Sequence, residues 1–159
     1  DAELHAFYGR GSYDAVHKGN PERMKWMDDM EQKAKDLDGV TDHGKVSQRR
    51  IMEEGFMAGL WAYPCPFPEI YAITAVKSQA SGAVPVSSNF AALDETVQFG
   101  IKQEFKEFDD DDLETYKNNL IKALKDVEWQ ESIRPKMMAW ARTLSWQKTA
   151  EGWDKDFRA

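Results

Sequence analysis

The chain has only one cysteine, Cys65, among its 159 residues, so it cannot form a disulfide bond within itself. This fits a reducing compartment, and we expect a cytoplasmic protein. No histidine neighbours Cys65 in the sequence to activate its thiol. A buried packing role is therefore favoured over a nucleophilic one.

Long apolar runs are also lacking. None approaches the roughly 20 residues that a membrane-spanning helix needs, and the N-terminus has no signal-peptide pattern. Basic residues are not in excess either, because the net charge is -7. We therefore expect neither a nucleic-acid partner nor a transmembrane segment. The hydrophobic content of 42% and the six tryptophans predict a folded chain, with a single domain over residues 1–159.

Strand and helix patterns alternate over the first 90 residues. Strands are predicted near residues 4–8, 40–42, 60–63 and 84–87. Helix-start signals follow at Asn20 and Ser47, and a third helix is predicted to open at Glu69. This order predicts an α/β fold with a parallel sheet flanked by helices. A loop over residues 93–100 and extra C-terminal helices complete the predicted architecture.

Apolar residues at helical spacing give the first two long helices a face toward the core. The candidate core residues are Met24, Met27, Met30, Ala34, Ile51, Met52 and Phe56. A methionine stripe can also form an adaptable binding surface, but core packing is favoured.

Three further patterns give weak functional signals. Gly9-Arg10-Gly11 follows a predicted strand, but Asp14 stands at the third glycine position of a dinucleotide loop, and no helix is expected to open there. The three histidines lack metal-ligand spacing. The four aspartates at 109–112 could form a metal cluster, but helix capping is favoured because acids complement the helix dipole.

Glu69 stands where a predicted strand gives way to a predicted helix. In a parallel α/β sheet, ligands bind beyond the carboxyl ends of the strands, where helix N-termini present free N–H groups. Glu69 could instead only cap its helix, and the residues alone leave both interpretations open.

The stretch "YPCPFPEIYAITAVKSQASGAVPVSSNFAALDETV" resembles the donor-binding signature of the GT-B glycosyltransferases of family 4, the group 1 type. That signature has a proline-bearing strand end, a glutamate, a small residue followed by glycine, a proline–valine strand and a later glutamate. Here these positions hold Pro64, Glu69, Ser81-Gly82, Pro85-Val86 and Glu95. Flanking stretches such as "ELHAFYG" and "SWQKTAEGWDKDF" also resemble the family, so the resemblance covers nearly the whole chain.

This resemblance implies a Rossmann-like, C-terminal half of a GT-B enzyme. Such a domain binds a nucleotide-sugar, and the intact protein transfers the glycosyl group, of the hexosyl type, to an acceptor with retention of configuration. Glu69 would be the catalytic residue and would hold donor-sugar hydroxyls. The donor-binding residues would be His43, Gly44, Lys45, Glu69, Ile70, Tyr71, Ala72, Ile73 and Lys77. No cofactor and no metal are expected, because the helix dipole and basic side chains can neutralise the leaving diphosphate.

The chain departs from the family pattern at Lys77, which stands where the family has a second glutamate that accepts hydrogen bonds from ribose hydroxyls. A lysine can only donate, so Lys77 is expected to reach a phosphate, or simply to be a solvated surface residue. The resemblance also implies that an acceptor-binding domain and a first strand–helix unit precede Asp1. We therefore expect this chain alone to be inactive and, through Trp146, Trp153 and Phe157, to self-associate. The alternative function is a non-catalytic module that binds nucleotide-sugars or a partner.

Overall fold

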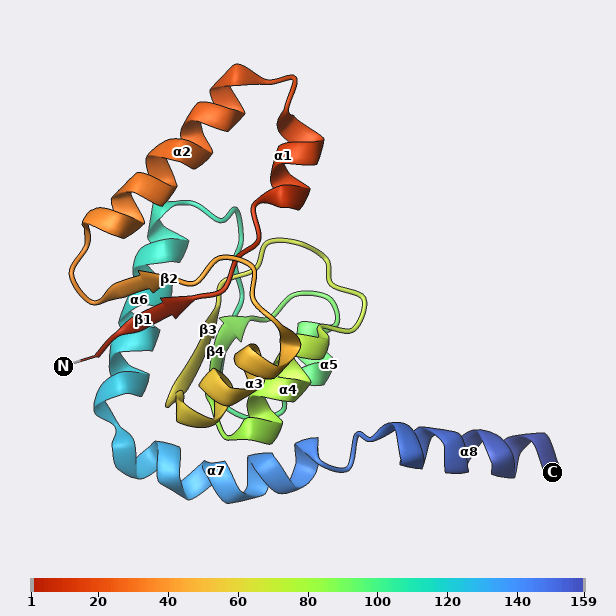
Figure 1. The fold of residues 1–159 in the computed structure, drawn as a ribbon. Helices are drawn as coiled ribbons and strands as arrows, with labels where there is room; N and C mark the ends of the chain where they lie inside the picture. Colours follow the sequence, from red (N-terminus) through yellow and green to blue (C-terminus); the bar gives the residue numbers. More distant parts are fainter. Residues whose placement is uncertain (1, 159) are drawn as a thin grey trace. The chain divides into compact units, whose positions relative to one another are not determined.

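The computed structural model of the chain describes residues 2–158 (Figure 1). The chain divides into two compact units, one ending at Ile51 and the other beginning at Met52. The single domain predicted for residues 1–159 stays a prediction.

Strands and helices alternate through most of the chain. The first unit holds β1 (Leu4–Ala6), α1 (Gly11–His17), α2 (Pro21–Asp36), β2 (Val40–Asp42) and the start of α3 (Gln48–Met57). The second unit continues with β3 (Leu60–Tyr63), α4 (Ile73–Ser81), β4 (Val84–Ser88), α5 (Leu93–Thr96), β5 (Ile101–Gln103), α6 (Asp110–Lys125), α7 (Val127–Ala141) and α8 (Trp146–Arg158). The protein is thus an α/β protein with small parallel sheets flanked by helices and several C-terminal helices, as the alternation predicts.

The first unit is built on the parallel pair β1–β2, in which Leu4 lies opposite Val40 and Ala6 opposite Asp42. The predicted start of α2 is confirmed, because the side chain of Asn20 accepts a hydrogen bond from Arg23 N at 3.1 Å. A helix does begin at Gly11, contrary to the sequence prediction. Arg10, at its N-cap position, is held by Asp14, Asp28 and Glu31 at 2.6, 2.5 and 3.0 Å. The glycine pair therefore leads into a helix whose N-cap arginine is held by three acidic side chains.

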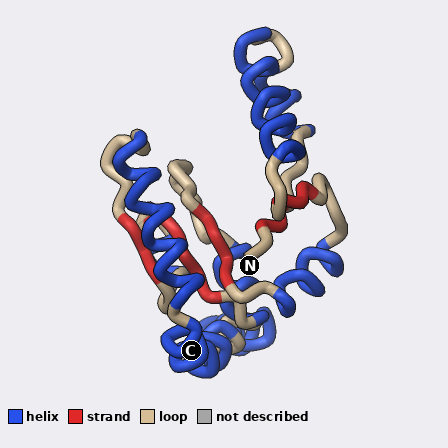
Figure 2. Tube along the Cα trace, turned by 90° about the vertical axis from the view of Figure 1, so that its left-hand side faces the viewer, coloured by secondary structure: helices blue, strands red, loops and turns tan. Residues whose placement is uncertain are grey.

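The second unit has a three-stranded parallel sheet in the order β3-β4-β5. Figure 2 shows these strands side by side, with a helix covering one face. Its central strand β4 is buried along its whole length. One apolar cluster joins α4 and α5 residues such as Ala75 and Leu93 to Trp61, and a second joins Val86 on β4 to Tyr116 on α6. The parallel strands therefore form two small sheets rather than the one sheet expected.

Two local predictions have opposite outcomes. The aspartate run caps a helix, because Asp109 accepts a hydrogen bond from Asp112 N at 3.0 Å and so fixes the start of α6. Met52 and Phe56 were expected to face the core but are 54% and 58% exposed. The helical spacing of α3 marks an apolar face correctly, but it does not show whether the fold covers that face.

Candidate functional site

Glu69 lies in the loop between β3 and α4, half-buried, and is held by Tyr63 at the end of β3. The phenolic hydroxyl of Tyr63 donates a hydrogen bond to Glu69 Oε1 at 2.7 Å. Tyr63 is the last residue of its strand, so the carboxylate lies beyond the carboxyl end of this part of the sheet. This is the edge at which parallel α/β sheets bind their ligands.

The helix that follows begins later than predicted. Glu69 was expected to open it, but α4 starts at Ile73. Ala72 takes the N-cap position in the left-handed conformation, with φ 53° and ψ 60°, and its side chain is buried. The chain therefore turns sharply just before the helix, and the N–H of Glu69 is bonded to the carbonyl of Phe67 instead. Glu69 is consequently not the cap of α4, so the interpretation of this residue as a helix cap is wrong.

A hollow of about 440 Å³ lies over this loop and the first turn of α4. Its lining residues are Tyr63, Phe67, Glu69, Ile70, Tyr71, Ala72, Ile73 and Thr74. Several of these side chains are apolar and open to solvent: Ile70 is 96% exposed and Tyr71 is 50% exposed. The first-turn N–H groups of a helix have no partner inside that helix. The hollow thus combines a carboxylate, apolar walls and the positive end of α4.

Hydrogen bonds to neighbouring segments fix the loop that carries Glu69. Ser88, at the end of β4, donates to the carbonyl of Cys65 at 2.7 Å. The N–H of Ala92 donates to the carbonyl of Glu69 at 3.2 Å. Because Cys65 and Glu69 are both tied to neighbouring segments, Glu69 keeps a defined position. Cys65 packs against the apolar cluster beside α4, which confirms its predicted packing role, but it is only partly buried.

The environment of Tyr63 keeps its phenol protonated. Burial raises the pKa of Tyr63, and the hydrogen bond to Glu69 raises it further. The phenol of Tyr63 is therefore the donor in this hydrogen bond, and Glu69 Oε1 is the acceptor. A carboxylate has about four lone-pair sites. The Tyr63 bond occupies one of them, so the carboxylate retains capacity to accept hydrogen bonds from hydroxyls of a ligand.

Gln79 holds α4 against the segment around α5, a role that the sequence does not indicate. Its side chain is fully buried in α4 and donates to the carbonyl of Thr96 at 2.7 Å. Its Oε1 atom accepts from the N–H of Gln98 at 3.2 Å. Gln79 thereby locks α4 to the segment around α5. A glutamine on a predicted helix gives no signal of this role, because its partners are backbone groups distant in sequence.

Lys77, a predicted donor-binding residue, and Glu95, the later glutamate of the resembling signature, lie on separate helices. Lys77 is exposed on α4, one turn after Ile73, and Glu95 is exposed on the short helix α5. A helix that opened at Glu69, as predicted, would carry both Glu69 and Lys77. In the structure α4 carries only Lys77, because Glu69 precedes the helix.

Three of the predicted donor-binding residues, His43, Gly44 and Lys45, belong to the first unit. His43 follows β2 and stacks on Phe7, with ring centroids 4.6 Å apart. Gly44 has a φ of +59° and donates its N–H to Asp42 Oδ1 at 2.8 Å, and Lys45 is exposed. The structure also brings His43 within 3.0 Å of His5, although the two lie far apart in the sequence. Ligand spacing along the chain does not indicate this pair, because the two histidines meet only across β1 and β2.

No model of a known protein family matches this chain, and no curated protein matches it. Among residues 2–158, no helix is both long and apolar enough to cross a membrane.

Proposed function

We propose that the second unit binds a nucleotide-sugar donor, and that the intact protein is a retaining glycosyltransferase of the GT-B type. The observation that carries this proposal is the Tyr63–Glu69 hydrogen bond, at 2.7 Å, beyond the carboxyl end of β3. It holds a carboxylate at the hollow in front of α4. The resemblance to the family 4 signature centres on this same glutamate.

In this proposal the donor sugar lies against Glu69 and its diphosphate against the start of α4. The carboxylate accepts hydrogen bonds from sugar hydroxyls and so positions the anomeric carbon. Backbone N–H groups of Tyr71, Ala72 and Ile73 hold the diphosphate. Each interaction of a helix N-terminus with an exposed anionic group contributes about 0.3–1 kcal/mol. No metal ion is required, because these groups oppose the charge that develops on the leaving diphosphate.

A second candidate function is a nucleotide-sugar-binding module without transferase activity. Lys77 favours it, because this position holds an acid in the resembling family and a lysine cannot accept the ribose hydrogen bonds. Both candidates need the same donor site at Glu69. They differ in whether the intact protein turns the donor over.

Isothermal titration of the chain with uridine, guanosine and adenosine diphosphate sugars tests the binding step. We expect at least one of them to bind, and Glu69→Gln to weaken that binding about 10- to 100-fold, since hydrogen bonds to charged groups contribute about 1.5–3 kcal/mol. Glu128→Gln, which changes an exposed acid on α7, is the matched control and is expected to bind as the unchanged chain does. Absence of binding to every donor, or equal binding by Glu69→Gln, would contradict the proposal. Donor turnover by the full-length protein then separates the two candidate functions.

A further inference from the structure

The pairing of β1 with β2 gathers three rings on one face of the first unit. His5 lies opposite Thr41 in the parallel register, and the pairing continues past β2 because the N–H of His43 donates to the carbonyl of Ala6 at 2.9 Å. Side chains two residues apart on a strand share a face. The ring of His43 therefore meets those of both His5 and Phe7.

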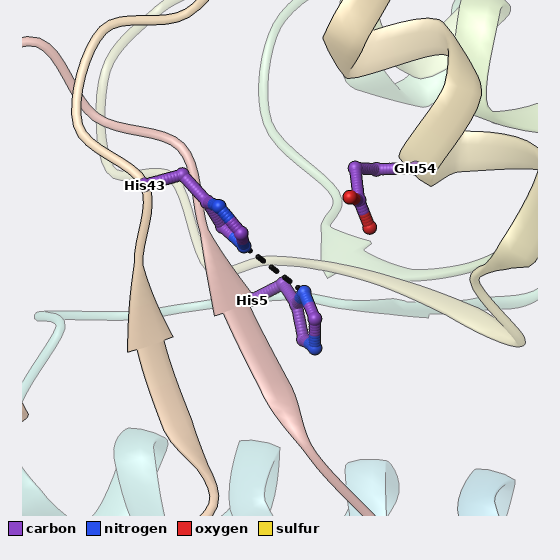
Figure 3. Close-up of side chains that lie close together, drawn as sticks. All are labelled: His5, His43 and Glu54. Carbon is purple, nitrogen blue, oxygen red and sulfur yellow. Dashed lines mark hydrogen bonds between the residues drawn. The ribbon is translucent and has the colours of Figure 1, made fainter.

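The two imidazoles face each other through one nitrogen each. His43 Nε2 and His5 Nδ1 are 3.0 Å apart, and the ring centroids are 5.1 Å apart (Figure 3). On the far side of His5, its Nε2 atom lies 3.4 Å from a carboxylate oxygen of Glu3. Phe7 stacks almost parallel to the ring of His43, at an interplanar angle of 4°. Glu3 thus orients the ring of His5 and Phe7 orients the ring of His43, and the two facing nitrogens stay close to each other.

We propose that His5 Nδ1 and His43 Nε2 chelate a transition-metal ion of the Zn²⁺, Ni²⁺ or Cu²⁺ type. Metal–imidazole bonds of about 2.0–2.1 Å at angles between square-planar and tetrahedral place two nitrogens about 2.8–3.4 Å apart. The observed separation of 3.0 Å falls in this interval. The site uses residues of the first unit only and does not rest on the proposed sugar-donor function.

Proton positions in the pair suit such a site. When Glu3 accepts the proton of His5 Nε2, the Nδ1 atom of His5 carries a lone pair. In the metal-free pair, His43 Nε2 supplies the proton of the hydrogen bond between the rings. Metal binding requires His43 to carry that proton on Nδ1 instead, which changes the tautomer without releasing a proton. The Glu3 carboxylate then acts as the outer partner that commonly orients a ligating histidine.

The donor atoms also define which ions are excluded. Two imidazole nitrogens favour borderline ions, whereas Mg²⁺ and Ca²⁺ take oxygen ligands. Water would complete the coordination of an ion held by two side chains. Binding should weaken as pH falls, because a ligating imidazole must be neutral.

Metal titration of the untagged full chain tests the site. We expect Cu²⁺ to bind saturably at one equivalent per chain. The electron paramagnetic resonance spectrum of the bound Cu²⁺ should show two nitrogen ligands. Mg²⁺ should not bind. His5→Gln and His43→Gln should each lose that binding. His17→Gln is the matched control, because His17 lies on α1 and stacks on Tyr13 instead, and it should bind as the unchanged chain does.

Glu3→Gln provides a second variant that leaves both ligands in place. It should weaken Cu²⁺ binding about 10- to 100-fold by removing the outer carboxylate. Thermal unfolding without metal should give similar midpoints for all variants, since His5, His43 and Glu3 lie at or near the surface. Absence of saturable binding, equal binding by the His5 and His43 variants, or loss of binding in His17→Gln would each overturn the proposal.

Discussion

Tyr63 and Glu69 are joined by a 2.7 Å hydrogen bond that spans the proline-containing loop after β3. The donor is the last residue of a strand, and the acceptor lies in a loop that is itself tied to β4 and to the segment before α5. A carboxylate that is simply solvated at the surface does not require hydrogen bonds that fix its position. This relationship therefore connects the packing of the second unit to its proposed chemistry.

Changing Tyr63 and Glu69 one at a time should separate the effect of the Glu69 charge from the effect of its orientation by Tyr63. Glu69→Ala in the full-length protein should lower turnover strongly, because the carboxylate contributes to transition-state binding more than to packing. Tyr63→Phe keeps the charge and removes only the orienting hydroxyl, so it should lower turnover less. Steady-state kinetics and thermal unfolding of both variants provide the measurement. A collapsed unfolding midpoint with normal residual turnover in Glu69→Ala would show a purely structural role.

Lys77 should affect the nucleotide part of the donor rather than the sugar. Lys77→Glu restores the acid of the resembling family and should change nucleotide affinity while leaving the preference among sugars unaltered. Lys122→Glu, an equal charge change on the exposed face of α6, serves as the control. Titration of both variants with a nucleotide diphosphate and with two of its sugars distinguishes the effects. Unchanged nucleotide affinity in Lys77→Glu would mark Lys77 as a solvated surface lysine.

The sequence predicts the elements of this fold better than it predicts their exposure or exact ends. Cap residues such as Asn20 and Asp109 act locally, so their hydrogen bonds could be predicted from neighbouring positions. The late start of α4 could not, because the left-handed turn at Ala72 depends on packing against distant residues and not on an alanine's own preference. The His5–His43 contact needs the register of β1 on β2, which no short motif encodes.

Gly100 should not tolerate a side chain. Its φ is +96°, and a Cβ atom placed on it would lie 2.1 Å from the carbonyl oxygen of Pro85 on β4. Gly100→Ala should therefore lower the free energy of unfolding by roughly 2 kcal/mol or more, through backbone strain and displacement of β5. Gly152→Ala is the control, because that glycine lies in α8 with nothing within 4 Å of the new atom. Chemical denaturation that gave equal stabilities for both variants would contradict this account.

Tyr116 should make the second unit sensitive to high pH. It donates to the carbonyl of Val86 at 2.6 Å, and burial raises its pKa above the ordinary value of 10.0. Above about pH 10 the unfolded chain loses the phenol proton while the folded chain retains it, so stability should fall as pH rises through this range. Denaturation measured between pH 8 and about 11 should show a smaller fall in Tyr116→Phe. An equal slope in both proteins would show that Tyr116 does not contribute to the pH dependence.

The apolar face of α8 should cause the isolated chain to self-associate. Trp146, Trp153 and Phe157 lie along one side of the helix and are 83%, 57% and 86% exposed. Burial of apolar surface contributes about 25 cal/mol per Å², so aromatic side chains left in water favour contact with a second surface. Sedimentation velocity should show concentration-dependent association that is lost when all three aromatics are changed to glutamine. Lys148→Gln, on the same helix, should associate as the unchanged chain does. A chain that stays monomeric at high concentration would contradict the prediction, because the exposed aromatics would then be stable in water without a partner.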